Sequence, residues 1–179
     1  YEATSTKKAT AGVDLYMNKV DINKLIEVIP MVDTMLPMLK SFEGIIDCQI
    51  VATTQFDSMM NINLPATKAS CYVHGKDLVL LDGETFRKIS RILLLKNKKR
   101  KLIDSLSLEF FMRENKIVFF PFSIQMVRYR AMVGGVQNAD MSFDYHASLI
   151  NSPLPFKLGV NIKGNPDKPK IRPARAKYK

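Results

Sequence analysis

The chain has 179 residues, of which 46% are hydrophobic, and it carries 27 Lys and Arg residues against 17 Asp and Glu residues. This length and apolar content suffice for one domain with a hydrophobic core and exclude a disordered protein. The apolar runs fall short of the ~18 residues that a membrane-spanning helix needs, and no signal-sequence pattern opens the chain. Because the chain begins with Tyr1 and not Met, we interpret it as a segment of a larger protein.

The net charge of +10 comes from two segments, the run from Lys96 to Lys101 and the tail after Ile162. Removing their twelve cations together with Asp167 leaves 15 basic and 16 acidic residues. Such segments can contact anionic lipid surfaces, although solvated loops are the simpler interpretation. No zinc-finger spacing, base-stacking motif or recognition helix accompanies them, which argues against nucleic acid as a partner. The candidate contacts to an anionic surface are Lys98, Lys99, Arg100, Lys101, Lys170 and Arg172.

The N-terminal part of the chain predicts a strand and then a helix. Residues 1–11 are polar and aperiodic, which predicts a flexible lead-in, and residues 13–20 predict a short strand. A helix is predicted to follow from Ile22 to about Ser41, kinked at Pro30 and Pro37. Its apolar residues recur at helical spacing: Ile22, Leu25, Ile26, Ile29, Val32, Met35, Leu36 and Leu39.

The next part predicts short strands and a second helix. Alternation predicts strands over residues 46–53 and 69–73, and a turn at 74–77 precedes a short buried strand at 78–81. The second helix is predicted to start at Asp82 and to end in the Lys-rich run, where cations favour a helix C-terminus. Its apolar residues at helical spacing are Phe86, Ile89, Ile92 and Leu93, and its solvated side carries Arg87, Lys88 and Arg91.

Four further runs predict an antiparallel meander. The first places Leu106, Leu108, Phe110 and Met112 on one face. The second, residues 117–133, predicts a long bent strand with an edge position or bulge at Pro121, and with Phe120, Phe122, Ile124 and Met126 on one face. Gly134-Gly135 predicts a hairpin, and strands follow over 139–149 and 156–163. The prolines and cations of residues 165–179 predict a disordered tail.

These elements predict an α+β domain over residues 12–164. Its curved, mostly antiparallel, groove-like sheet would carry two amphipathic helices on its apolar face. The two short helices are not expected to cover the whole face, so part of it is predicted to meet lipid. A closed core is the alternative for each residue. The lipid-facing candidates are Leu106, Leu108, Phe110, Phe122, Ile124, Met126, Met141, Phe143 and Tyr145.

No constellation of residues predicts catalysis, a cofactor or a metal site. Asp140, Asp144 and His146 share one face of a predicted strand, but a solvated face has the same pattern. Cys48 and Cys71 lie outside any metal-binding spacing, and both fall in predicted strands. They are interpreted as buried free thiols, and a cross-strand disulfide in an oxidising compartment stays open.

The order of the elements resembles the AsmA-like C-terminal region of Gram-negative envelope proteins. The best matching pieces are Gly75–Leu80 before the second helix, Ile117–Phe122, Gly135–Gln137, Phe143–Leu149 and Leu158–Gly164. The resemblance covers residues 12–172. It implies a periplasmic module of a protein anchored in the inner membrane by an element outside this segment, in the group that includes AsmA and TamB.

The resemblance implies a non-enzymatic function in the cell envelope. Proteins of this group resemble long β-sheet grooves with an apolar lining, associated with phospholipid movement and outer-membrane biogenesis. The expected partners are phospholipid or another acyl-chain ligand, the membrane surface and outer-membrane assembly proteins. A module that assists outer-membrane protein assembly without binding lipid is the alternative.

Overall fold

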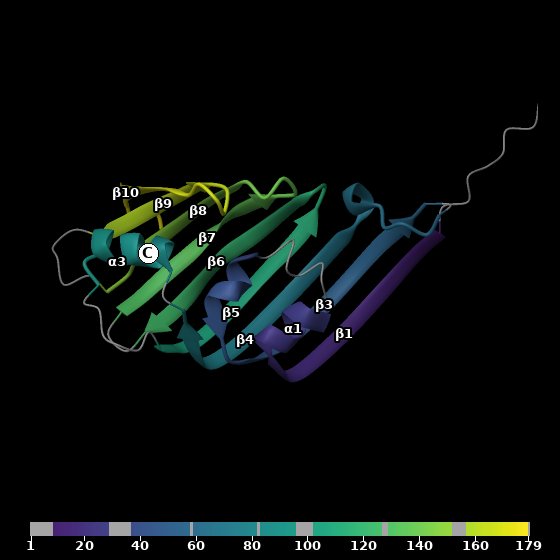
Figure 1. The fold of residues 1–179 in the computed structure, drawn as a ribbon, viewed down its shortest axis with the longest axis horizontal. Coiled ribbons are helices and arrows are strands. Elements are labelled where there is room, and N and C mark those ends of the chain that lie inside the picture. The colour runs from purple at the N-terminus through teal and green to yellow at the C-terminus, as the bar shows by residue number, and fades with distance from the viewer. Residues whose placement is uncertain are drawn as a thin grey trace, which may run out of the picture.

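The computed structural model describes residues 9–28, 37–57, 59–81, 83–95, 102–126, 129–151 and 157–178 (Figure 1). The described strands form one ten-stranded antiparallel sheet in the order β1-β3-β4-β5-β6-β7-β8-β9-β10, with β2 paired to β4. The strands are β1 (Ala9–Asp21), β2 (Phe42–Glu43), β3 (Ile45–Phe56), β4 (Lys68–Leu80), β5 (Leu102–Arg113), β6 (Lys116–Met126), β7 (Tyr129–Asn138), β8 (Phe143–Leu149), β9 (Leu158–Gly164) and β10 (Lys170–Arg175).

Two α-helices and two short 3₁₀ helices accompany the described strands. They are α1 (Ile22–Val28), η1 (Pro37–Ser41), η2 (Leu64–Ala66) and α3 (Glu84–Ile92). Figure 1 shows α1 and α3 on the same face of the sheet, with α1 near β1 and α3 near β10. Ile22 and Leu25 of α1 are buried in the core, and Ile89 and Ile92 of α3 pack against it. The expected fold class, a curved antiparallel sheet with two amphipathic helices on its apolar face, is confirmed.

One face of the sheet is apolar from edge to edge, because strand pairing aligns the apolar positions of successive strands. One such row runs through Leu15, Ile50, Cys71, Phe110, Phe119, Gly135, Tyr145, Ile162 and Ile171. Within it, the rings of Phe110 and Phe119 lie 5.3 Å apart between centroids, and those of Phe119 and Tyr145 lie 5.7 Å apart. We call this surface the apolar face and the opposite surface the outer face.

The meander differs from its predicted boundaries in two places. Residues 117–133 belong to two strands, β6 and β7, and the pairing register shifts between Phe119 and Phe122, so the bulge expected at Pro121 is confirmed. The shift places Phe119 on the apolar face and turns Phe120 to the outer face, where its ring contacts Phe111. The hairpin predicted at Gly134-Gly135 is wrong, because both glycines lie inside β7 and the chain turns at residues 139–142.

The polar turn before β8 also corrects the start of that strand. Ala139 and Met141 were predicted to begin it, but they lie in the turn, and β8 begins at Phe143. Asp140 shapes the turn, because its carboxylate accepts hydrogen bonds from the backbone N–H and the hydroxyl of Ser142 at 2.9 and 2.6 Å. These hydrogen bonds lower the pKa of Asp140. A local side-chain interaction thus replaces the alternation predicted there.

The tail is ordered where it was predicted to be disordered. Residues 170–175 form β10, which pairs with β9 at six positions. Residues 176–178 then cross the outer face, where the backbone N–H groups of Lys177 and Tyr178 donate to the Ser148 hydroxyl at 2.9 and 3.1 Å. The Tyr178 ring contacts the ring of His146. His146 and Ser148 are therefore buried, although their alternation had predicted a solvated face.

The N-terminal half contains longer strands than predicted. β1 starts at Ala9, so residues 9–11 are strand and not flexible lead-in. β4 is continuous from Lys68 to Leu80, which makes the turn predicted at 74–77 wrong; Asp77 has a φ of 53° and interrupts only the local pairing. The predicted first helix corresponds to α1 and η1, and its residues 29–36 lie outside the described residues.

Candidate functional site

The apolar face is closed over its centre and exposed near β1. Val13 and Leu15 on β1 are 53% and 39% exposed, and both point to this face opposite Ala52 and Ile50 of β3. We define the open strip as the group of residues on this face at the β1 edge: Ala11, Val13, Leu15, Met17, Ile50 and Ala52. It continues through the aligned row into the closed core at Cys71. Large exposed apolar residues that adjoin a core in this way are typical of a binding surface.

The alternation along β1 explains the open strip. Odd residues from Ala11 to Met17 are apolar and even residues include Asp14 and Asn18. Because strand residues alternate between faces, the apolar ones share the face on which α1 lies. The helix contacts the Asp21 end of β1, where the chain turns directly from strand into helix. The residues at the other end of the strand stay exposed.

Most of the predicted lipid-facing residues lie in the closed part of the face. Leu106, Leu108, Phe110 and Tyr145 are buried, and the Tyr145 hydroxyl donates to Gln137 Oε1 at 2.7 Å. Burial raises the pKa of Tyr145, which keeps this hydroxyl protonated as a donor. The half-buried members pack against the same core: Phe122, Ile124, Met126 and Phe143. Met141 lies in the β7–β8 turn and is also half-buried.

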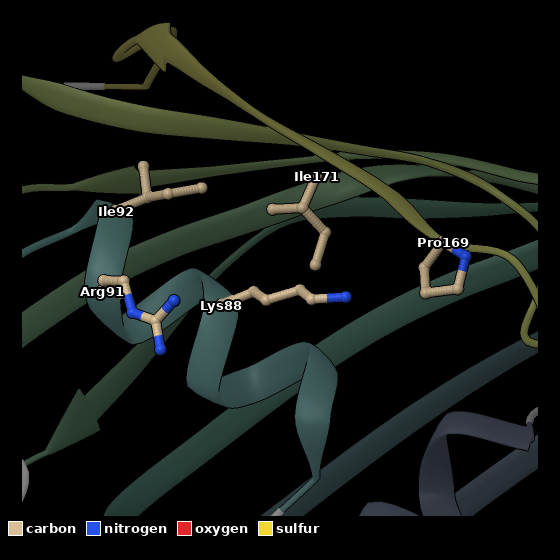
Figure 2. A pocket seen from close by; sticks show the side chains of 5 residues that line it. All are labelled: Lys88, Arg91, Ile92, Pro169 and Ile171. Atoms are coloured by element: carbon tan, nitrogen blue, oxygen red, sulfur yellow. The ribbon is translucent and has the colours of Figure 1, made fainter.

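A second feature is a shallow pocket of about 360 Å³ between α3 and β10. Ile92, Pro169 and Ile171 form its apolar side, and Lys88 and Arg91 place two cations at its rim (Figure 2). Lys88 also pairs with Glu84 at 2.6 Å, but both side chains are at least half exposed, so this pair is weak. Cations beside apolar carbon suit a ligand with an anionic group next to an apolar chain.

Of the predicted cationic contacts, the two that the structure describes do not line this pocket. Lys170 and Arg172 are exposed and lie on the outer face of β10, because Ile171 between them points to the apolar face. Lys98, Lys99, Arg100 and Lys101 lie outside the described residues. The pocket cations Lys88 and Arg91 were predicted only as the solvated side of a helix, and no signal in the sequence places that helix beside β10.

The polar residues considered for catalysis make an ion pair and hydrogen bonds to neighbouring strands and to the C-terminal segment. Asp144 pairs with Lys163 at 2.7 Å across β8 and β9. His146 Nδ1 lies 2.6 Å from Asn161 Oδ1, and its Nε2 accepts from the Lys177 backbone N–H at 3.2 Å. Among the described residues, no group of three or more His, Cys, Asp or Glu is arranged to hold a metal ion.

The sequence contained one usable signal for the open strip, namely the alternation of Val13, Leu15 and Met17. That alternation predicted a strand but not its place at the edge of the sheet.

Among the helices that the structure describes, none is long and apolar enough to span a membrane. No protein-family model, curated protein or solved structure matches the chain.

Proposed function

We propose that the chain binds phospholipid acyl chains on the apolar face of its sheet, as a non-enzymatic periplasmic module of an AsmA-like protein anchored in the inner membrane. In this function the module holds or conducts phospholipid on its way to the outer membrane and so supports outer-membrane biogenesis. The observation that carries the proposal is the open strip, where Val13 and Leu15 are exposed on the face that elsewhere forms the core.

The dimensions of the open strip suit an acyl chain. The seven β1 residues from Ala11 to Met17, four of which belong to the open strip, span roughly 20 Å at the rise of an antiparallel strand. The hydrocarbon of one bilayer leaflet is about 15 Å thick, half of the whole core. Each methylene group that is transferred from water onto such a surface contributes about 0.8 kcal/mol to binding. An acyl chain that lies along the open strip therefore gains affinity without any polar contact.

Neighbouring residues of β1 provide a matched test. Leu15 points to the apolar face, whereas Tyr16 points to the outer face and is 65% exposed. We expect Leu15→Asp to lower phospholipid occupancy in native mass spectra by about tenfold. A bound acyl chain would either strip water from the new carboxylate or leave the open strip, and both outcomes weaken binding. Tyr16→Asp adds the same charge one residue away and should retain occupancy within about twofold.

Both variants should melt close to the parent, since both positions are exposed, and circular dichroism checks this. A photo-crosslinking side chain gives a second measurement with the same pair of positions. At Leu15 it should capture lipid from vesicles, and at Tyr16 it should not. Equal loss of occupancy by both variants, or no lipid uptake by the parent chain, would contradict the proposal.

The α3–β10 pocket gives the proposal an electrostatic component. We expect Lys88→Glu combined with Arg91→Glu to weaken binding to vesicles of anionic phospholipid at low salt, because each cation near such a surface contributes about 1 kcal/mol. The control is Lys68→Glu with Lys76→Glu, the same charge change on exposed outer-face positions of β4. Flotation measures binding, and the difference between the pairs should shrink at high salt. Equal weakening by both would mean that only net charge matters.

The second candidate function is an interaction module for outer-membrane protein assembly. The observation that favours it is β1, a strand of 13 residues at the edge of the described sheet, because an exposed edge can pair with a strand of another protein. Lipid uptake separates the two functions. A parent chain that takes up no phospholipid but binds a purified outer-membrane assembly protein through β1 would favour this alternative.

A further inference from the structure

Two thiols lie in contact inside the core, on neighbouring strands. Cys48 on β3 and Cys71 on β4 are 3% and 5% exposed, and their Sγ atoms lie 3.6 Å apart. Cys48 is paired with Val73 and Cys71 with Ile50, so the two cysteines are diagonal neighbours on the apolar face. They lie where this face changes from the open strip at Leu15 and Ile50 to the closed core at Phe110.

The contact makes the two thiols chemically different. The hydrogen bond from Cys71 lowers the pKa of the Cys48 thiol, although burial opposes this effect. The same hydrogen bond and burial raise the pKa of Cys71. Because a thiolate is the attacking species in thiol–disulfide exchange, the direction of these shifts favours Cys48 as the first nucleophile, and the same disulfide forms if Cys71 attacks first.

We propose that Cys48 and Cys71 form a disulfide that joins β3 to β4 beside the open strip when the chain meets a disulfide oxidant. A disulfide needs the sulfur atoms about 2.05 Å apart, so they must approach by roughly 1.5 Å. Diagonal positions on paired strands lie about 7–8 Å apart, at the upper limit for a disulfide, so bond formation must draw β3 and β4 together locally, within their existing register. The distance, the shared face and the burial of both thiols carry the inference, and it does not depend on lipid binding.

The reaction is ordinary thiol–disulfide exchange. The Cys48 thiolate attacks one sulfur of the oxidant disulfide, forms a mixed disulfide and displaces one oxidant thiolate. Cys71 then loses its proton and attacks Sγ of Cys48, which forms the internal disulfide and displaces the second oxidant thiolate. The two cysteines lose two electrons, the oxidant disulfide gains them, and both released protons pass to the displaced thiolates or to water. Because both sulfurs are buried, the first attack requires local opening of the structure around them or occurs during folding.

The test uses the whole chain with oxidised glutathione as the probe. The chain is folded in its presence, unfolded in denaturant with an alkylating reagent, and weighed intact and after trypsin digestion. We expect a mass lower by two hydrogen atoms, no alkylation, and a link between the peptides Ser41–Lys68 and Ala69–Lys76. Dithiothreitol should restore two alkylated thiols. The urea midpoint of the oxidised chain should exceed that of the reduced chain, because the bond restricts the unfolded state.

Single variants provide the controls. Cys48→Ala and Cys71→Ala each leave one thiol, which should stay alkylatable or carry a single glutathione, and oxidant should no longer raise their urea midpoints. The comparison of oxidised and reduced parent chain needs no variant and holds even if an alanine variant folds poorly. Two alkylated thiols after oxidative folding, or disulfides found only between two chains, would overturn the inference. Neither result bears on the lipid-binding proposal, whose test is carried out on the reduced chain.

Discussion

Removal of residues 170–179 is expected to lower the free energy of unfolding by roughly 3–5 kcal/mol, a large part of the stability of a domain of this size. The truncation removes β10, and with it the pairing partner of β9. Val160 and Ile162 of β9 are buried in the full chain, and Ile171 packs against their side of the core. Their exposure removes apolar burial and strand hydrogen bonds at once. Urea unfolding followed by circular dichroism measures the change.

A shorter truncation separates the strand from the segment that follows it. Removal of residues 176–179 keeps β10 but uncovers His146 and Ser148, which then hydrogen-bond to water in place of the Lys177 backbone. We expect this variant to lose only about 1 kcal/mol, since water replaces the lost partners. Equal stability of the full chain and the 170–179 truncation would show that the tail is disordered, as its prolines and cations had predicted.

Gly135→Ala is expected to destabilise the fold by roughly 3–5 kcal/mol, through steric overlap and backbone strain together. Gly135 lies inside β7 with a φ of +154°, a conformation that side chains rarely adopt. A Cβ atom there would lie 2.2 Å from the backbone oxygen of Asp144 and 2.7 Å from Cα of Tyr145. Backbone atoms of β8 cannot give way without breaking the pairing of the two strands.

Gly12→Ala is the matched control, because Gly12 also lies in a strand but its added Cβ would meet only the backbone oxygen of Ala52, at 3.8 Å. This variant should melt within a few degrees of the parent, or slightly above it, since alanine restricts the unfolded chain. Thermal unfolding of both variants tests the pair. Similar melting temperatures would mean that no backbone atom lies close to Gly135. That outcome would contradict its position inside β7 and would fit the exposed hairpin turn predicted from the sequence.

The strands and the apolar face could be predicted because alternation is a local property. Whether Leu106, Leu108 and Phe110 share a face depends only on the two-residue period of a strand. The bulge at Pro121 could also be predicted, because proline lacks the N–H that a central strand must donate. These features follow from the geometry of the backbone near each residue. The sequence alone therefore determined the fold class and, outside the bulge in β6 and the turn before β8, which side chains share the apolar face.

The open part of the apolar face was decided by the tertiary structure. Leu15 and Phe110 have the same pattern along their strands, yet Phe110 is buried and Leu15 is exposed. The difference arises because β5 lies between β4 and β6, whereas β1 lies at the edge of the described sheet with its helix at one end. The tail was also decided by the tertiary structure. Its prolines and cations favour disorder locally, but the pairing of β10 with β9 outweighs that preference. Burial and pairing depend on residues far along the chain, and local spacing carries no information about them.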